Sequence, residues 1–273
     1  PFASGAIFGT IQRMFRHQGP SRSERQNTAL AAYLACVGGF VNSAGFVLVG
    51  SFTSHVTGNV GRLADDLAMR ELAAAGAAFT MIVAFFTGAC AASLIVESRR
   101  FKRTPTAYGV ALACEAVLLA SFGLAASTAF ADSPRLRDAE ALLLCVAMGV
   151  QNSLVTRLSG AVVRTTHLTG VVTDLGIETA RWIAHWRRRL RGPKSRERPV
   201  VAKIRLHLTI LGTFITGALG GCSLALRWHA AVVWLPTAAV TAGAVYAFAT
   251  ARDAPLRASL HPRPQDPHPG TPG

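Results

Sequence analysis

The sequence predicts an all-α membrane protein with six transmembrane helices, arranged as two inverted-topology three-helix repeats with broken or re-entrant segments. Three observations lead to this fold class. The 273 residues are 51% hydrophobic and only 15% charged, whereas soluble domains carry roughly 25% charged residues. The charged residues are concentrated between long apolar stretches. One short polar motif also occurs in both halves of the chain, each time after an apolar stretch.

Six uncharged or nearly uncharged stretches are long enough to cross a bilayer, because about 20 helical residues span a hydrocarbon core of about 30 Å. A soluble protein would instead need six long helices that are apolar on every face, which is unusual. Glu115 is the one acidic residue well inside such a stretch. The spans are expected at residues 31–49, 73–96, 107–130, 139–156, 206–226 and 229–250.

The basic residues predict the orientation of these spans. With the N-terminus inside, 23 Lys and Arg residues lie on the inner side and 5 on the outer side. Since cytoplasmic loops carry the excess of basic residues, both termini are expected in the cytoplasm. The basic loop 181–205 is expected to face anionic lipid headgroups. This explanation of the net charge of +14 is favoured over nucleic-acid binding.

Four segments follow from this topology. Residues 1–27 are expected to form a basic cytoplasmic tail, and residues 28–131 the first three-helix repeat. Residues 132–251 are expected to form the second repeat, which contains the basic loop. Residues 252–273 are rich in proline and poor in bulky apolar side chains, a composition typical of disorder.

The two halves align through several short motifs. "GGFVNSAGF" (38–46) aligns with "MGVQNSLVT" (148–156), and "HVTG" (55–58) aligns with "HLTG" (167–170). Further on, "FFTGA" (85–89) aligns with "FITGA" (214–218), and these small-residue segments are expected to be faces of tight helix packing. Because each repeat holds an odd number of spans, the second repeat must enter the bilayer in the opposite orientation.

A break is expected within each repeat. Residues 26–61 are uncharged, and as one straight helix they would extend about 54 Å, well beyond the hydrocarbon core. Glycines allow the backbone to leave the helix, and non-helical backbone is tolerated at membrane depth where it lines a cavity or is buried in protein. The sequence therefore predicts a central site between two broken segments, as in secondary transporters. The glycines assigned to the breaks are Gly50, Gly58, Gly160 and Gly170.

The motifs "GGFVNSAGF…HVTGN" and "MGVQNS…TTHLTG" also resemble those of the YoaK-like family of bacterial inner-membrane proteins, a family named for a domain of unknown function. The resemblance covers about residues 28–250. It implies a multipass membrane fold and carries no established substrate. Two positions depart from the family pattern: Asn42 stands where an acidic residue is often found, and the second motif continues with Val171 instead of asparagine. Any cation coupling through that acid is therefore in doubt for this chain.

Polar residues near the breaks are the candidate site. His55 and His167 suit a proton relay or gate, because histidine titrates near pH 6.5, or alternatively cap a broken helix. Amides inside the spans either bind substrate or join helices by hydrogen bonds. Glu115 either couples proton movement or is a neutral, hydrogen-bonded acid. The candidate substrate-binding residues are Asn42, Ser43, His55, Thr57, Asn59, Gln151, Asn152, His167 and Thr169.

The function expected from these features is a small-solute transporter or channel, with Glu115 as the candidate for proton coupling, and not an enzyme. The sequence contains no conventional catalytic motif and no ligand pattern for a metal or cofactor. The alternative is a non-transporting membrane scaffold or regulatory subunit that binds a cytoplasmic partner through the basic loop. The expected partners are the lipid bilayer, a small solute and a second copy of the chain, but no nucleic acid.

Overall fold

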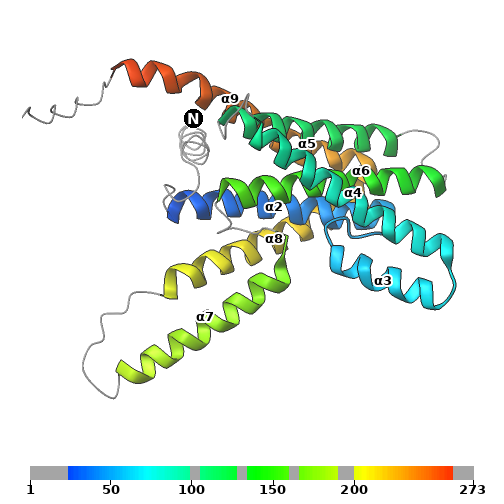
Figure 1. Cartoon of the computed structure of the whole chain (residues 1–273), viewed down its shortest axis with the longest axis horizontal. Helices are drawn as coiled ribbons and strands as arrows, with labels where there is room; N and C mark the ends of the chain where they lie inside the picture. Colours follow the sequence, from blue (N-terminus) through cyan, green and yellow to red (C-terminus); the bar gives the residue numbers. More distant parts are fainter. Residues whose placement is uncertain (1–23, 99–104, 128–133, 160–165, 190–199, 261–273) are drawn as a thin grey trace, which may run out of the picture.

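The computed structural model describes residues 24–98, 105–127, 134–159, 166–189 and 200–260, and the regular structure within these ranges is helical (Figure 1). The elements in chain order are α2 (Glu24–Val49), α3 (Val56–Ala68), α4 (Leu72–Glu97), α5 (Pro105–Ala126), α6 (Pro134–Leu158), α7 (Leu168–Arg189), α8 (Val200–Trp228), the short 3₁₀ helix η2 (His229–Val233) and α9 (Trp234–Leu260).

The long helices are apolar enough to cross a membrane. Candidate spans coincide with α2, α4, α5 and α6, and a fifth covers Val201–Ala251. This fifth segment is 51 residues long and contains α8, η2 and α9. The chain is therefore a helical protein whose composition indicates several passes through a membrane. The third predicted span is shorter than expected, because α5 ends at Ala126 and not at residue 130.

Helical structure extends beyond the predicted spans in three places. Helix α3 follows the first expected break, and α7 occupies much of segment 157–205, which was expected to be a loop. Helix α9 continues to Leu260, into the expected disordered tail, whereas residues 261–273 lie outside the described residues. A search for uncharged stretches misses α3 and α7 because both are amphipathic helices with charged faces.

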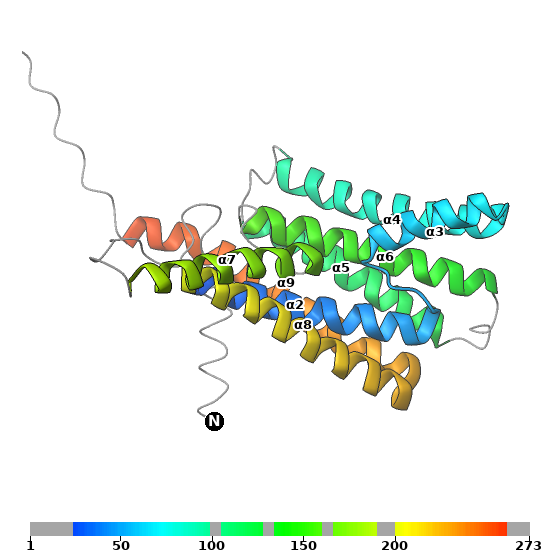
Figure 2. The same cartoon turned by 90° about the horizontal axis from the view of Figure 1, so that it is seen from below.

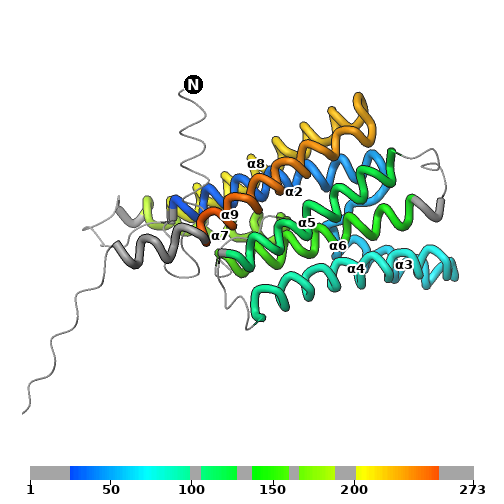
Figure 3. The backbone as a smooth tube through the Cα atoms, turned by 90° about the horizontal axis from the view of Figure 1, so that it is seen from above, coloured from blue at the N-terminus to red at the C-terminus, as the bar shows by residue number. Residues whose placement is uncertain are grey.

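The two halves of the chain are interleaved rather than side by side. Helix α2 from the first half packs along α8 from the second, and α4 packs along α6. Helices α5 and α9 pack against each other, while α3 covers α4 and α7 covers α8. Helices α2 and α6 run in opposite directions, and α3 and α7 lie at opposite ends of the bundle (Figures 1 and 2). The tube view shows the same arrangement from the other side (Figure 3).

Glycines allow the close approach of α2 to α8 and of α4 to α6. A methyl group on Gly221 would overlap the backbone carbonyl of Phe40 on the facing helix, and the same overlap with a backbone carbonyl occurs at four further glycines. Small residues of this kind let helix backbones come close in membranes, so the packing role expected for the "FFTGA" and "FITGA" segments is confirmed. The four contacts form two matched pairs: Gly39 with Phe214 and Gly149 with Phe85, then Gly88 with Val146 and Gly217 with Cys36.

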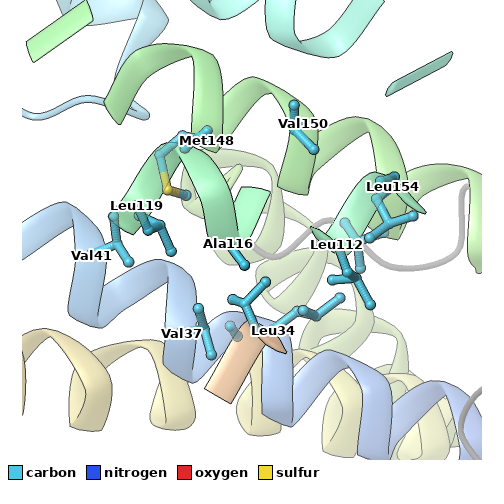
Figure 4. Packing of buried hydrophobic residues seen from close by; sticks show 14 of the residues in the cluster. Leu34, Val37, Val41, Leu112, Ala116, Leu119, Met148, Val150 and Leu154 are labelled. Carbon is cyan, nitrogen blue, oxygen red and sulfur yellow. The ribbon is translucent and has the colours of Figure 1, made fainter. Parts of the chain in front are cut away.

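The main apolar core lies where α2, α5 and α6 meet (Figure 4). Leu34 and Val41 come from α2, Leu112 from α5, and Met148 and Leu154 from α6. The exposed fraction of each of these side chains is 3% or less. The bundle interior is thus closely filled by large side chains at the level where α2 and α6 cross.

Candidate functional site

Both halves contain a hydrogen bond between a helix asparagine and the hydroxyl residue that precedes the histidine, and we call this contact the anchor. In the first half the asparagine is Asn42. Helix α2 ends at Val49, where Gly50 takes a positive φ of 74° and its N–H bonds to the carbonyl oxygen of Phe46. Such a left-handed residue is a common helix terminator, usually a glycine. The chain then turns back, so that Ser54 donates to Asn42 Oδ1 from both its backbone nitrogen (3.2 Å) and its hydroxyl (2.9 Å).

Residues 50–55, which turn back after α2, bring polar backbone groups alongside that helix. Asn42 lies seven residues before the end of α2, a distance of about 10 Å along the helix axis. The loop therefore runs back along α2 before α3 begins. Thr53 is 1% exposed and lies against Gly45, whereas its neighbour Phe52 is 42% exposed. The loop is therefore buried in part, and non-helical backbone at membrane depth is tolerated where protein covers it.

The second half repeats this anchor with Asn152. The Asn152 side chain donates from Nδ2 to the carbonyl oxygen of Met148 (2.8 Å), and its Oδ1 accepts a hydrogen bond from the hydroxyl of Thr166. Helix α7 begins two residues later, at Leu168. The hydroxyl residue that precedes the histidine thus binds the helix asparagine in both halves. Gly160, predicted to be a break residue here, lies outside the described residues.

The His-x-Thr-Gly motif forms the start of the helix that follows each anchor. His55 is the residue before α3 and makes no side-chain hydrogen bond to cap it. Its ring covers the backbone of Gly58, and the ring of His167 covers Gly170 in the same way. The motif therefore needs glycine because a side chain at that position would occupy the place of the histidine ring.

Replacing Gly58 with alanine is expected to displace the His55 ring and to lower the free energy of unfolding by about 1–2 kcal/mol, as overpacking does. Adding His55→Ala to this variant should recover most of the loss, because the obstructing ring is removed. Thermal unfolding of the purified protein in detergent measures both effects. Gly61→Ala is the control, since Gly61 lies in the same helix with open space around it. Equal stability of Gly58→Ala and Gly61→Ala would contradict the ring placement.

The other motif residues differ in exposure. His55 and Thr57 are exposed, and so are His167 and Thr169 in the second half. Asn59 is 6% exposed and faces into the protein. The predicted substrate-binding residues are therefore divided between an exposed set at the helix starts and a less exposed set, in which Asn42, Asn59 and Gln151 are buried and Ser43 and Asn152 are partly buried.

The two anchor asparagines lie on either side of the place where α2 and α6 cross. Helices α2 and α6 cross near Gly38, where an added Cβ would lie 3.7 Å from Met148 Cε and 3.1 Å from Thr166 Cγ2. Asn42 and Asn152 each lie four residues beyond this crossing, about 6 Å along their helices. Because the helices are antiparallel (Figure 2), these displacements point in opposite directions. Asn42 therefore lies on one side of the crossing and Asn152 on the other, while Thr166, which binds Asn152, lies against the crossing itself. We call each anchor with its polar neighbours a half-site.

Gln151 is the polar residue at the crossing itself. It is 0% exposed and donates from Nε2 to the carbonyl oxygen of Leu34 (3.1 Å). Its Oε1 has no hydrogen-bond partner among the described residues and lies 3.4 Å from the Cβ position of Gly38. A buried acceptor without a partner is costly, which distinguishes Gln151 from a purely structural link between helices.

Glu115 lies in a separate part of the bundle. It is 1% exposed on α5, and its Oε2 has no hydrogen-bond partner among the described residues. It is near enough to interact electrostatically with Tyr33, whose hydroxyl donates to the carbonyl oxygen of Ala239 (2.6 Å). Glu115 therefore belongs to the layer formed by α2, α5 and α9.

A polar network between α4 and α6 was not predicted as a unit. Arg157 forms an ion pair with Glu97 and donates to the Ser93 hydroxyl (3.2 Å), which is 2.8 Å from the Ser153 hydroxyl. The sequence marks Arg157 only as a basic residue at a helix end. Its partners are distant in sequence and become neighbours only through the packing of α4 on α6. Within the described ranges, no group of three or more His, Cys, Asp and Glu residues is placed to hold a metal.

Comparison with known proteins gives a family but no characterised relative. Residues 30–246 match a family described as "Protein of unknown function (DUF1275)". No curated protein and no solved structure matches the chain. The match includes both anchors, both His-x-Thr-Gly motifs and the glycine contacts.

Proposed function

The chain belongs to the DUF1275 family of proteins of unknown function, and from this premise we propose that it transports a small solute across the bacterial inner membrane. The observation that carries this proposal is the duplicated anchor. The first anchor holds a loop that turns back along α2, the second holds Thr166 just before α7, and the two anchors lie on antiparallel helices. Broken segments at corresponding positions of two halves are the features that build substrate sites in secondary transporters.

The proposal includes two inverted repeats with six spans, in which α2, α4 and α5 correspond to α6, α8 and α9. The paired contacts support this correspondence: α2 with α8 mirrors α6 with α4, and the four glycine contacts mirror one another residue by residue. Helix α3 corresponds to α7, because each is the amphipathic helix that follows the first span of its repeat. The name YoaK-like belongs to the same proposal, since the matched family is equally uncharacterised.

The packing between the two halves defines two helix pairs that would move as rigid bodies during transport. One body would be α2 with α8, and the other α4 with α6, because these pairs make the closest backbone contacts. The crossing of α2 and α6 at Gly38 would act as the pivot. The loop held by Asn42 would close the outer side, and the start of α7, held by Asn152 through Thr166, would close the inner side. Rocking about such a pivot would expose one half-site at a time, which is alternating access.

The remaining parts of the proposal concern coupling and assembly. Glu115 is a buried carboxyl in an apolar span, and such residues in transporters often carry protons. Its distance from both anchors in sequence and fold would make the coupling indirect. We also propose cytoplasmic termini and a homodimer, and we propose no enzymatic activity. The partners would be lipid and solute, with no role for nucleic acid.

Ligand screening by thermal unfolding tests transport. We expect at least one class of metabolite or inorganic ion to raise the melting temperature of the purified protein, because a ligand at 100 times its Kd adds about 2.7 kcal/mol to stability. Uptake of that solute into proteoliposomes should fall at least about tenfold in Asn42→Ala and in Asn152→Ala, in line with a cost of 1–3 kcal/mol for an unpaired buried group. Gly76→Ala, on a glycine with open space around it, should retain uptake.

A scaffold or regulatory subunit is the second candidate, and one observation favours it. The crossing of α2 and α6 is filled, with Met148 and Gln151 at most 1% exposed. A protein that never opens would need such a centre, and its partner would bind the basic segment 181–205. A panel without stabilising solutes, together with proteoliposomes that take up none of them, would favour this function over transport.

A further inference from the structure

Helix α7 combines many charges with exposed large apolar side chains. It is not among the candidate spans, yet Trp182, Ile183 and Trp186 are 46%, 39% and 57% exposed. Its last turns carry Arg187, Arg188 and Arg189. A helix that is strongly amphipathic, rich in Arg and Lys and provided with tryptophan is typical of the membrane interface, and not of the hydrocarbon core.

The contacts of α7 with α8 determine which face is exposed. Val171 and Glu178 are 4% and 7% exposed, and Glu178 pairs with Lys203 on α8 (3.6 Å). Trp182 and Trp186 are four residues apart, so they lie on one face of the helix one above the other. Helix α7 is thus held against α8 by one side while the two indole rings remain uncovered at the end of the bundle where α7 extends outward (Figure 1).

The charge of this region favours an anionic partner. Residues 181–205 contain ten Lys and Arg residues and one acidic residue. The acidic groups on α7 itself already face basic side chains: Glu178 pairs with Arg181 as well as Lys203, and Asp174 lies 3.9 Å from the imidazole of His207. The exposed aromatic face is therefore bordered by positive charge that the protein does not neutralise with nearby acids in this segment.

We propose that the C-terminal half of α7 is an interfacial helix that lies in the headgroup layer of the bilayer. Trp182, Ile183 and Trp186 insert at the boundary between headgroups and acyl chains, where tryptophan is enriched. Arg187, and Arg181, whose side chain is 62% exposed despite its pairing with Glu178, bind anionic lipid headgroups. We thereby assign the contact with anionic lipid, which the sequence predicts for the basic loop, to helix α7 and its apolar face. This inference does not depend on transport, because it concerns only the lipid surface.

Tryptophan fluorescence in proteoliposomes tests the proposal. The chain has four tryptophans, so the variant Trp228→Phe/Trp234→Phe reports only Trp182 and Trp186. We expect its emission to be blue-shifted and to be quenched more by lipid brominated near the headgroup than by lipid brominated near the chain terminus. Quenching should increase when phosphatidylglycerol is added to phosphatidylcholine vesicles. Arg181→Gln/Arg187→Gln in the same background should reduce this dependence on phosphatidylglycerol.

Two results would overturn the proposal. Red-shifted emission without quenching by either lipid would show that the indole rings lie in water. Blue-shifted emission without quenching would show that protein, such as a second copy of the chain, covers this face. The matched variant Trp182→Phe/Trp186→Phe, which reports Trp228 and Trp234 at the η2 turn, confirms that reconstituted protein can be quenched by lipid. Unchanged thermal unfolding of all variants would show that the fold is retained.

Discussion

Gly88→Ala and Gly217→Ala are each expected to lower the free energy of unfolding by about 2–3 kcal/mol, near the upper part of the usual cost of overpacking. In both cases the added methyl group would overlap a carbonyl of the facing helix, Val146 for Gly88 and Cys36 for Gly217. A backbone group cannot rotate away as a side chain can, so α4 must separate from α6, or α8 from α2. Thermal unfolding in detergent measures the loss.

The same helices provide matched controls for this prediction. Gly76 lies on α4 and Gly212 on α8, and a Cβ at either position meets nothing within 4 Å. Alanine there should be neutral or should stabilise the helix by up to about 1 kcal/mol, because glycine has the lower helix propensity. If Gly88→Ala and Gly76→Ala proved equally stable, the close approach of α4 to α6 would be contradicted. Similar losses of stability in Gly88→Ala and Gly217→Ala would support the structural equivalence of the two halves.

Cysteines at Ala64 and Gly176 are expected to react with a membrane-impermeant thiol reagent from opposite faces of the membrane. These residues occupy matching positions on α3 and α7, and both are exposed. Asn59 and Val171 would be poor labelling sites because they are buried. The experiment uses Ala64→Cys and Gly176→Cys singly, in a chain whose five native cysteines are replaced, within right-side-out cells or inverted vesicles.

Each cysteine is expected to be labelled from one face only, because an inverted repeat places matched positions on opposite sides of the membrane. Ala64→Cys should be labelled from the outside and Gly176→Cys only in inverted vesicles. Labelling of both from one side would contradict the inverted arrangement and the assignment of inner and outer half-sites. A further cysteine at Glu71, an exposed residue of the turn before α4, should follow Ala64 and so controls for local access.

Much of the candidate site could be predicted from the pairing of motifs in the two halves. Asn42 and Asn152, His55 and His167, and the glycines that follow them occupy equivalent places in the structure. The expectation that they lie around one central site stays a prediction, because α2 and α6 cross between the two anchor asparagines. Sequence alignment shows which residues correspond but contains no information on the distance between the corresponding places.

The sequence by itself determined the apolar helices, the internal pairing of motifs and the glycines needed for close contact. These features depend on the local transfer of side chains from water to lipid and on the absence of a Cβ, which each residue type carries with it. Only the tertiary structure decided that α2 packs on α8 and α4 on α6, that Arg157 meets Glu97, and that α7 leaves its tryptophans uncovered. These contacts join residues far apart in the chain, and they follow from how whole helix faces fit together rather than from any single segment.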